Sequence, residues 1–148
     1  MELRKTIIFI GHQEDDRKLF ETATGMANIP CSFLALESES WTLRLLNMSQ
    51  PFWFDSIFLD LENPSAPGIQ FLKEIKSIPH LKHIPVVVYT DSCTRSNLTA
   101  IQENGGAHFI PKPARTDTLV SIFDAFGKSE VLPFMLHYPV RDFTLQNF

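Results

Sequence analysis

The stretch "SIFLDLENPSAPG", residues 56–68, joins a wholly apolar run to a carboxylate and then to a loop. The run from Ile57 to Leu59 has no alternation of polar and apolar residues, which is typical of a strand buried on both faces of a sheet. Asp60 ends the run, and Pro67-Gly68 indicates a loop. Because burying a charged carboxylate costs free energy, an aspartate at this place needs a partner or a function.

Strand and helix patterns alternate along the rest of the chain. Apolar runs predict strands at residues 6–11, 31–37, 54–60, 84–90 and within 107–113. Helical spacing of apolar residues predicts helices at residues 14–27, 38–49, 69–78, 94–104 and 117–127. Apolar strands that alternate with helices predict an α/β fold with a parallel sheet covered on both faces.

Composition excludes several classes of protein. The chain has 148 residues, enough for one domain with a hydrophobic core. Its formal net charge of -4, without a basic cluster, disfavours nucleic-acid binding. No apolar run approaches the ~20 residues of a membrane-spanning helix. No signal-peptide pattern opens the sequence, so we expect a cytoplasmic protein.

The ends of three predicted strands carry reactive side chains. In open α/β sheets, sites lie beyond the carboxyl ends of the strands. Asp60, Thr90 and Lys112 end or follow the third, fourth and fifth predicted strands. We therefore expect a carboxylate, a hydroxyl and an ammonium to share one edge of the sheet.

These motifs are shared with a known family. The stretches "FDSIFLDLENPSAPG", "IPVVVYTDS" and "GGAHFIPKP" resemble the response-regulator receiver domain of bacterial two-component signalling, over about residues 4–127. The family places a proline four residues after its phosphoacceptor aspartate and a glycine four residues further, which Asp60, Pro64 and Gly68 match. The resemblance implies a flavodoxin-like (βα)5 fold. Its doubly wound five-stranded parallel sheet would have strand order 2-1-3-4-5 and helices on both faces.

The resemblance also implies roles for individual residues. Asp60 would be the phosphoacceptor, Thr90 and Lys112 would contact the phosphoryl group, and Phe109 would be the aromatic switch, although Phe109 also fits a plain core residue. The phosphoryl donor would be a sensor histidine kinase or a phosphotransfer protein. The output would come through contact with a further protein partner, not through catalysis on a substrate.

The chain departs from the family at the metal site. The family has two carboxylates just after its first strand, where this chain has Gly11 and His12. Asp60 and the backbone carbonyl at Glu62 would remain as Mg²⁺ ligands. Because hard cations prefer oxygen to imidazole, we expect Mg²⁺ binding to be weak or absent.

Three interpretations of this departure stay open. The domain is not phosphorylated in the usual way, and His12 mimics the missing cation. Alternatively, Glu14 or Glu62 restores enough of the metal site for slow phosphorylation. The third possibility is an offset in the alignment of the first strand.

The final stretch extends past the family pattern. We expect a receiver domain at residues 1–128 and a C-terminal extension at 129–148. The extension is too apolar for a disordered segment, and its prolines oppose a long helix. It would pack on the domain or at an interface, including one with a second copy of the chain.

Two other functions fit the sequence less well. "IFLDLEN" is similar to the nucleophile strand of haloacid-dehalogenase-type phosphatases, but Glu62 stands where those enzymes have a second aspartate. Flavin or nucleotide binding would need a phosphate loop after the first strand, where "GHQEDD" is acidic.

Overall fold

A five-stranded parallel sheet forms the centre of the protein, with strand order β2-β1-β3-β4-β5. The structure is a computed structural model that describes residues 5–28, 30–37, 55–61, 66–91 and 94–127. The strands are β1 Lys5–Ile10, β2 Cys31–Leu36, β3 Ser56–Asp60, β4 Val86–Thr90 and β5 Gly106–Pro111. The flavodoxin-like α/β fold predicted from the sequence is therefore confirmed.

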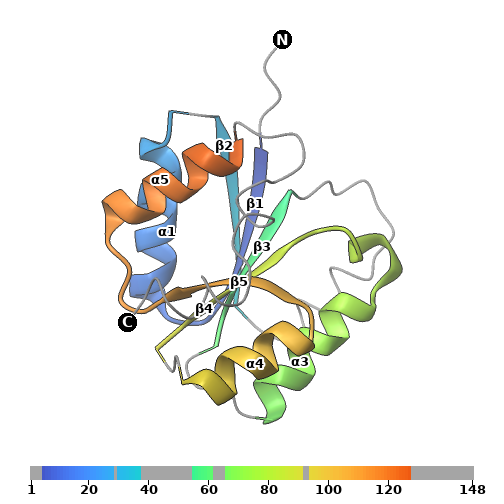
Figure 1. Ribbon diagram of the computed structural model, residues 1–148. Helices are drawn as coiled ribbons and strands as arrows, with labels where there is room; N and C mark the ends of the chain where they lie inside the picture. The colour runs from blue at the N-terminus through green and yellow to red at the C-terminus, as the bar shows by residue number, and fades with distance from the viewer. Residues whose placement is uncertain (1–4, 29, 38–54, 62–65, 92–93, 128–148) are drawn as a thin grey trace.

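Helices cover both faces of this sheet. They are α1 Glu14–Met26, α3 Ala66–Ser77, α4 Arg95–Glu103 and α5 Thr116–Gly127. Helices α1 and α5 lie together on one face, and α3 and α4 lie on the other (Figure 1). The helix expected at residues 38–49 and the extension at 129–148 fall outside the described residues.

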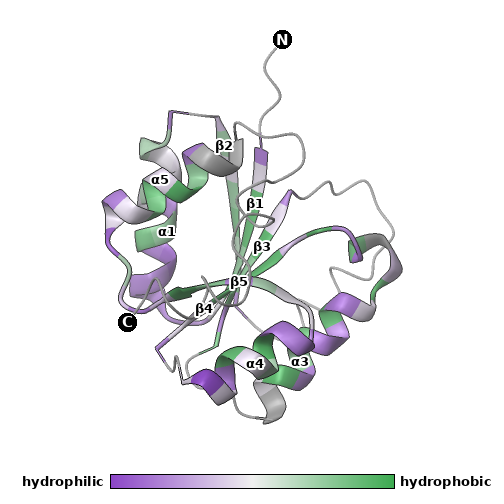
Figure 2. Ribbon diagram, viewed as in Figure 1, coloured by the Kyte–Doolittle hydropathy of each residue, from purple (hydrophilic) through white to green (hydrophobic). Residues whose placement is uncertain are grey.

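The sheet buries two apolar layers, one on each face. Strand residues alternate between the layers, so that Ile57 and Leu59 face α3 and α4 whereas Phe58 faces α1 and α5. Phe20 of α1 lies at the centre of the second layer, with its ring 5.7 Å from that of Phe58 and 5.0 Å from that of Tyr89. Figure 2 shows apolar residues concentrated along the strands, whereas the helices alternate between polar and apolar residues.

The helix ends explain why the elements stop where they do. Helix α1 carries three acidic residues in its first turn, where their negative charge interacts favourably with the positive end of the helix dipole. The Thr94 side chain accepts a hydrogen bond from the Asn97 amide (3.2 Å) and so caps α4. After α4, Gly105 has φ of 107°, a left-handed conformation that glycine adopts at low cost.

The segment before β4 differs from the prediction. A short 3-10 helix, Pro79–Leu81, precedes the strand, and β4 begins at Val86, not at residue 84. The Ile84 amide donates to the Leu81 carbonyl (3.0 Å), and Pro85 has no amide hydrogen to donate to the sheet. Ile84 therefore lies outside the sheet, whereas the Pro85 carbonyl accepts a hydrogen bond from the Ile57 amide of β3 (3.0 Å).

The length and composition of the helices bear on whether any of them could cross a membrane. Within the described part of the chain, none is both long and apolar enough to span a bilayer.

Candidate functional site

Asp60 is the last residue of β3 and lies at the carboxyl edge of the sheet. Its side chain is 3% exposed. Asp60 pairs in register with Tyr89 of β4, so both side chains point to the face covered by α1 and α5. The buried carboxylate inferred from the sequence is therefore present, at the predicted edge.

Lys112 follows β5 directly and supplies the cation for this carboxylate. Its Nζ lies 2.5 Å from Asp60 Oδ1, and its side chain is 12% exposed. The Lys112 amide donates to the Thr90 carbonyl (2.8 Å), which continues the pairing of β4 with β5. Two residues predicted from separate strands thus meet as a buried ion pair.

Tyr89 contacts both Lys112 and the segment that follows it. Lys112 Nζ lies 5.1 Å from the centre of the Tyr89 ring, within the range of a cation–π interaction. The Tyr89 hydroxyl accepts a hydrogen bond from the Ala114 amide (3.1 Å). One side chain therefore contacts the ammonium and also ties down the segment that carries it.

The electrostatics of Lys112 reflect two opposing effects. Burial lowers the pKa of its ammonium, but the hydrogen bond and the charge of Asp60, with a further contribution from Asp16, outweigh burial. The pKa of Lys112 is therefore raised above its usual value. Lys112 is a permanent cation at physiological pH.

Thr90 and Phe109, on the two strands beyond β3, are both buried. Thr90 ends β4 and is fully buried. Phe109 of β5 is 1% exposed and belongs to the apolar layer that faces α3 and α4. In this structure Phe109 is a core residue with its ring turned inward.

The residues at the family's acidic-pair positions bring no carboxylate to the site. Gly11 is buried, and an added Cβ would lie 2.8 Å from the Asp60 Cβ and 2.9 Å from Cε2 of Phe9. His12 is exposed. Glu14, one of the two residues expected to restore the metal site, is instead paired with Lys18 on α1 (3.1 Å), and Glu62, the other, falls outside the described residues. Among the described residues, no group of three or more His, Cys, Asp or Glu side chains could hold a metal ion.

The sequence did not single out Asp16, which also reaches the site. Asp16 Oδ2 lies 3.4 Å from Lys112 Nζ, and its side chain is 23% exposed. A signal for this position existed. Asp16 lies four residues before Phe20, so both occupy one face of α1, and Phe20 is buried against the sheet.

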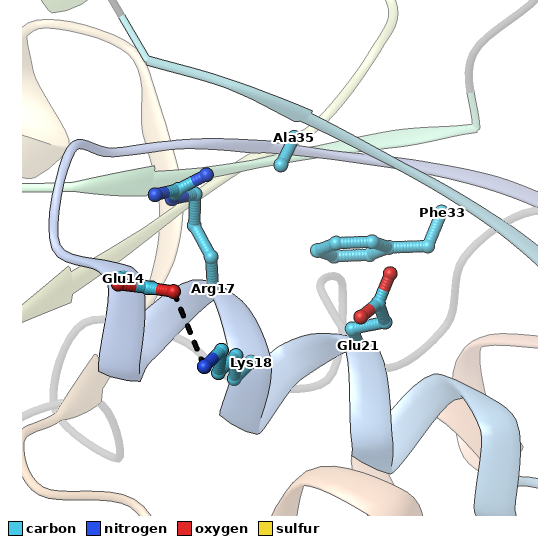
Figure 3. A pocket seen from close by; sticks show the side chains of 6 residues that line it. All are labelled: Glu14, Arg17, Lys18, Glu21, Phe33 and Ala35. Carbon is cyan, nitrogen blue, oxygen red and sulfur yellow. Dashed lines mark ion pairs between the residues drawn. The ribbon is translucent and has the colours of Figure 1, made fainter.

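A separate hollow lies between α1 and β2. It has a volume of about 200 Å³ and is lined by Glu14, Arg17, Lys18, Glu21, Phe33 and Ala35 (Figure 3). Arg17 Nη1 also lies 2.7 Å from Glu37 Oε1. Neither Asp60 nor Lys112 lines this hollow, so it is not part of the site at the strand ends.

The model of the response regulator receiver domain family matches residues 13–124. The chain belongs to this family. Receiver domains are signalling modules that accept phosphate from histidine kinases or phosphotransfer proteins, and they generally bind Mg²⁺ at an acidic site.

Individual relatives agree with this assignment. The chain is 32% identical over 89 residues to the phosphate regulon transcriptional regulatory protein PhoB of Escherichia coli, which is 60% of this chain and 38% of PhoB. It is also 32% identical over 82 residues to chemotaxis protein CheY-3 of Vibrio cholerae, or 55% of this chain and 63% of that protein. The chain therefore spans under two thirds of these relatives.

Solved structures show the same fold. The phosphorylated cyanobacterial phytochrome response regulator RcpA superimposes with a TM-score of 0.69 at 26% identity. The match covers 82% of this chain and 90% of RcpA. The strand order and the covering helices described above are those of a receiver domain.

Proposed function

We propose that this chain is a response-regulator receiver, in which Asp60 accepts a phosphoryl group and the signal passes on by protein–protein contact. The observation that carries the proposal is the 2.5 Å contact between Lys112 Nζ and Asp60 Oδ1 at the carboxyl edge of the sheet. A buried carboxylate held against a lysine at this place is the arrangement expected for a phosphoacceptor and its charge partner.

The proposed reaction is a phosphoryl transfer to a carboxylate. An Asp60 oxygen attacks the phosphorus of a phosphohistidine on a partner protein, a P–O bond forms, and the P–N bond breaks with the imidazole as leaving group. The acyl phosphate carries about two negative charges at neutral pH. Lys112 neutralises one phosphoryl oxygen and the Thr90 hydroxyl donates a hydrogen bond to another.

The metal is the part of the family mechanism that these residues do not match. Bound Mg²⁺ would neutralise negative charge on the phosphoryl group during transfer. Gly11 and His12 offer no carboxylate, which leaves Asp60 and the carbonyl at Glu62 as the proposed ligands. We therefore propose weak or absent Mg²⁺ binding and slow transfer.

The absence of carboxylates at Gly11 and His12 favours a second candidate function. Without the acidic pair, the domain would act as a pseudo-receiver, a contact module whose partner binds regardless of phosphorylation. The buried pair of Asp60 and Lys112 would then hold one conformation of the strand edge. Phosphorylation of the intact chain separates the two functions.

The experiment is intact-mass measurement after incubation with acetyl phosphate and Mg²⁺. We expect the wild-type chain to gain the mass of one phosphoryl group and Asp60→Asn to gain none. Asp55→Asn is the matched control, because Asp55 precedes the same strand and bonds to the Thr6 amide at the opposite end (2.7 Å). No mass gain in the wild type, also with a cognate kinase, would favour the pseudo-receiver.

We also propose that residues 1–128 form the receiver domain and that 129–148 is a C-terminal extension that packs on the domain or at an interface. Its apolar composition supports a packed or interfacial segment. Deleting residues 129–148 and measuring the solution mass tests this assignment. A dimer that becomes a monomer supports an interface between copies, whereas an unchanged monomer with lower stability supports packing on the domain.

A further inference from the structure

The carboxyl end of β1 lacks the carboxylates that the family uses there. Gly11 has no side chain, and its surroundings leave no room for one, because an added Cβ would meet Asp60 Cβ at 2.8 Å and the Phe9 ring at 2.9 Å. The ring of Phe9 itself belongs to the apolar layer under α1. Position 11 therefore cannot take an acid unless Phe9 or Asp60 shifts.

Helix α1 brings a carboxylate close to Lys112 at the carboxyl edge of the sheet. Its first turn carries Glu14, Asp15 and Asp16. Glu14 is paired with Lys18 and Asp15 is exposed, whereas Asp16 is half-buried with Oδ2 3.4 Å from Lys112 Nζ. The favourable effect of acids on the helix dipole applies to all three residues alike, so it does not explain why one of them turns inward.

Two carboxylates therefore share one ammonium. Lys112 Nζ contacts Asp60 Oδ1 on β3 and Asp16 Oδ2 on α1, and the Tyr89 ring lies on a third side. An ammonium has three donors and no fixed geometry, so a single partner leaves it free to swing on its flexible stem. A second anchor on another element restricts that motion.

We propose that Asp16 is a positioning residue that supplies a carboxylate in place of the absent acidic pair. Asp16 and Asp60 together hold the Lys112 ammonium in one position, an arrangement that we call the clamp, so that Lys112 is the fixed cation of the site. The consequence for transfer rests on the proposed function, since an oriented Lys112 is what the incoming phosphoryl group would meet. The clamp itself does not depend on phosphorylation.

The test has two arms, with Asp16→Asn against Asp15→Asn as its matched control. Both variants remove one negative charge from the same helical turn. In the first arm, the unphosphorylated proteins are labelled with an amine-reactive ester at fixed pH, and labelling of Lys112 is measured by peptide mapping relative to exposed Lys82. In the second arm, the rate of mass gain from acetyl phosphate is measured.

We expect Asp16→Asn to raise the relative labelling of Lys112 several-fold and to slow phosphorylation, whereas Asp15→Asn changes neither. Asp16→Glu, which keeps the charge on a longer stem, should restore part of the protection. The clamp is overturned if Lys112 in Asp16→Asn is labelled to the same extent as in the wild type. It is also overturned if Asp16→Asn and Asp15→Asn change the labelling of Lys112 equally. An unchanged or faster phosphorylation rate overturns the positioning role.

The two arms separate this inference from the proposed function. If the wild-type chain takes no phosphoryl group, the proposed phosphoacceptor role fails and the labelling arm still decides whether Asp16 clamps Lys112. If phosphorylation occurs but Asp16→Asn leaves Lys112 as protected as before, only the clamp fails.

Discussion

Lys112 Nζ lies 2.5 Å from Asp60 Oδ1, and both side chains are almost withdrawn from water. The two residues come from strands that are not neighbours, with β4 between them. Their contact therefore depends on the whole carboxyl edge of the sheet. Removing either partner has consequences for stability that are separate from any signalling role.

Replacing Lys112 with Met should destabilise the domain by about 3 kcal/mol, because it leaves the Asp60 charge buried without its main cation. The double variant with Asp60→Asn should recover most of that loss, since the uncompensated charge is gone. Urea unfolding of the wild type, both single variants and the double variant gives the coupling free energy. Strictly additive effects would contradict a direct pair.

Tyr89→Phe should loosen the segment after Lys112. The substitution keeps the ring but leaves the Ala114 amide without its 3.1 Å acceptor, at a cost of about 1–2 kcal/mol. Hydrogen exchange of the Ala114 amide should become faster than in the wild type. Unchanged protection of that amide would show that the tyrosine hydroxyl does not hold the segment.

His108 makes stability depend on pH. It is buried in β5, and burial lowers its pKa to about 4 from the ordinary 6.5. Between these two values the unfolded chain binds a proton that the folded chain refuses, so folding stability falls as pH drops from 6.5 to 4. The loss attributable to this residue is about 3 kcal/mol.

The measurement compares the wild type with His108→Phe across that range. The variant cannot titrate at this position, so its unfolding free energy should fall less steeply between pH 6.5 and 4. Parallel curves for the two proteins would show that His108 is not held neutral by burial.

Substitution by alanine should change stability in opposite directions at Gly11 and at Gly25. Gly11→Ala should destabilise by about 1–3 kcal/mol, because the added Cβ would press on Asp60 and Phe9. Gly25→Ala should be neutral or stabilising by up to about 1 kcal/mol, since it lies in α1 with nothing within 4 Å of the added atom. Thermal unfolding of both variants checks the pair. A tolerated Gly11→Ala would reopen position 11 to a restored acid.

Much of this architecture could be predicted from the sequence, because a strand that is buried on both faces of a sheet has an unbroken run of apolar residues. The unbroken apolar run that ends at Asp60 predicts a central strand, and Asp60 does end β3. The strand ends also indicated the meeting of Asp60 with Lys112. That prediction needed only the rule that parallel strands present their carboxyl ends at one edge.

The role of Asp16 could not be read in the same way. Three consecutive acids open α1, and the helix dipole accounts for all of them equally. Which acid turns inward depends on how α1 is rotated against the sheet, and the packing of Phe20 and Ala23 sets that rotation. The sequence analysis named Glu14 or Glu62 as the substitute acid. Glu14 lies two residues before Asp16 and pairs with Lys18 on α1.

The most direct test of the central claim is the chemical location of the phosphoryl group. After treatment with acetyl phosphate, borohydride reduces an aspartyl phosphate to homoserine, and peptide sequencing by mass spectrometry finds the position. We predict homoserine at position 60 in the wild type and in Asp16→Glu, and at no position in Asp60→Asn. Homoserine at another aspartate, with Asp60 unmodified, would contradict the assignment of Asp60 as phosphoacceptor.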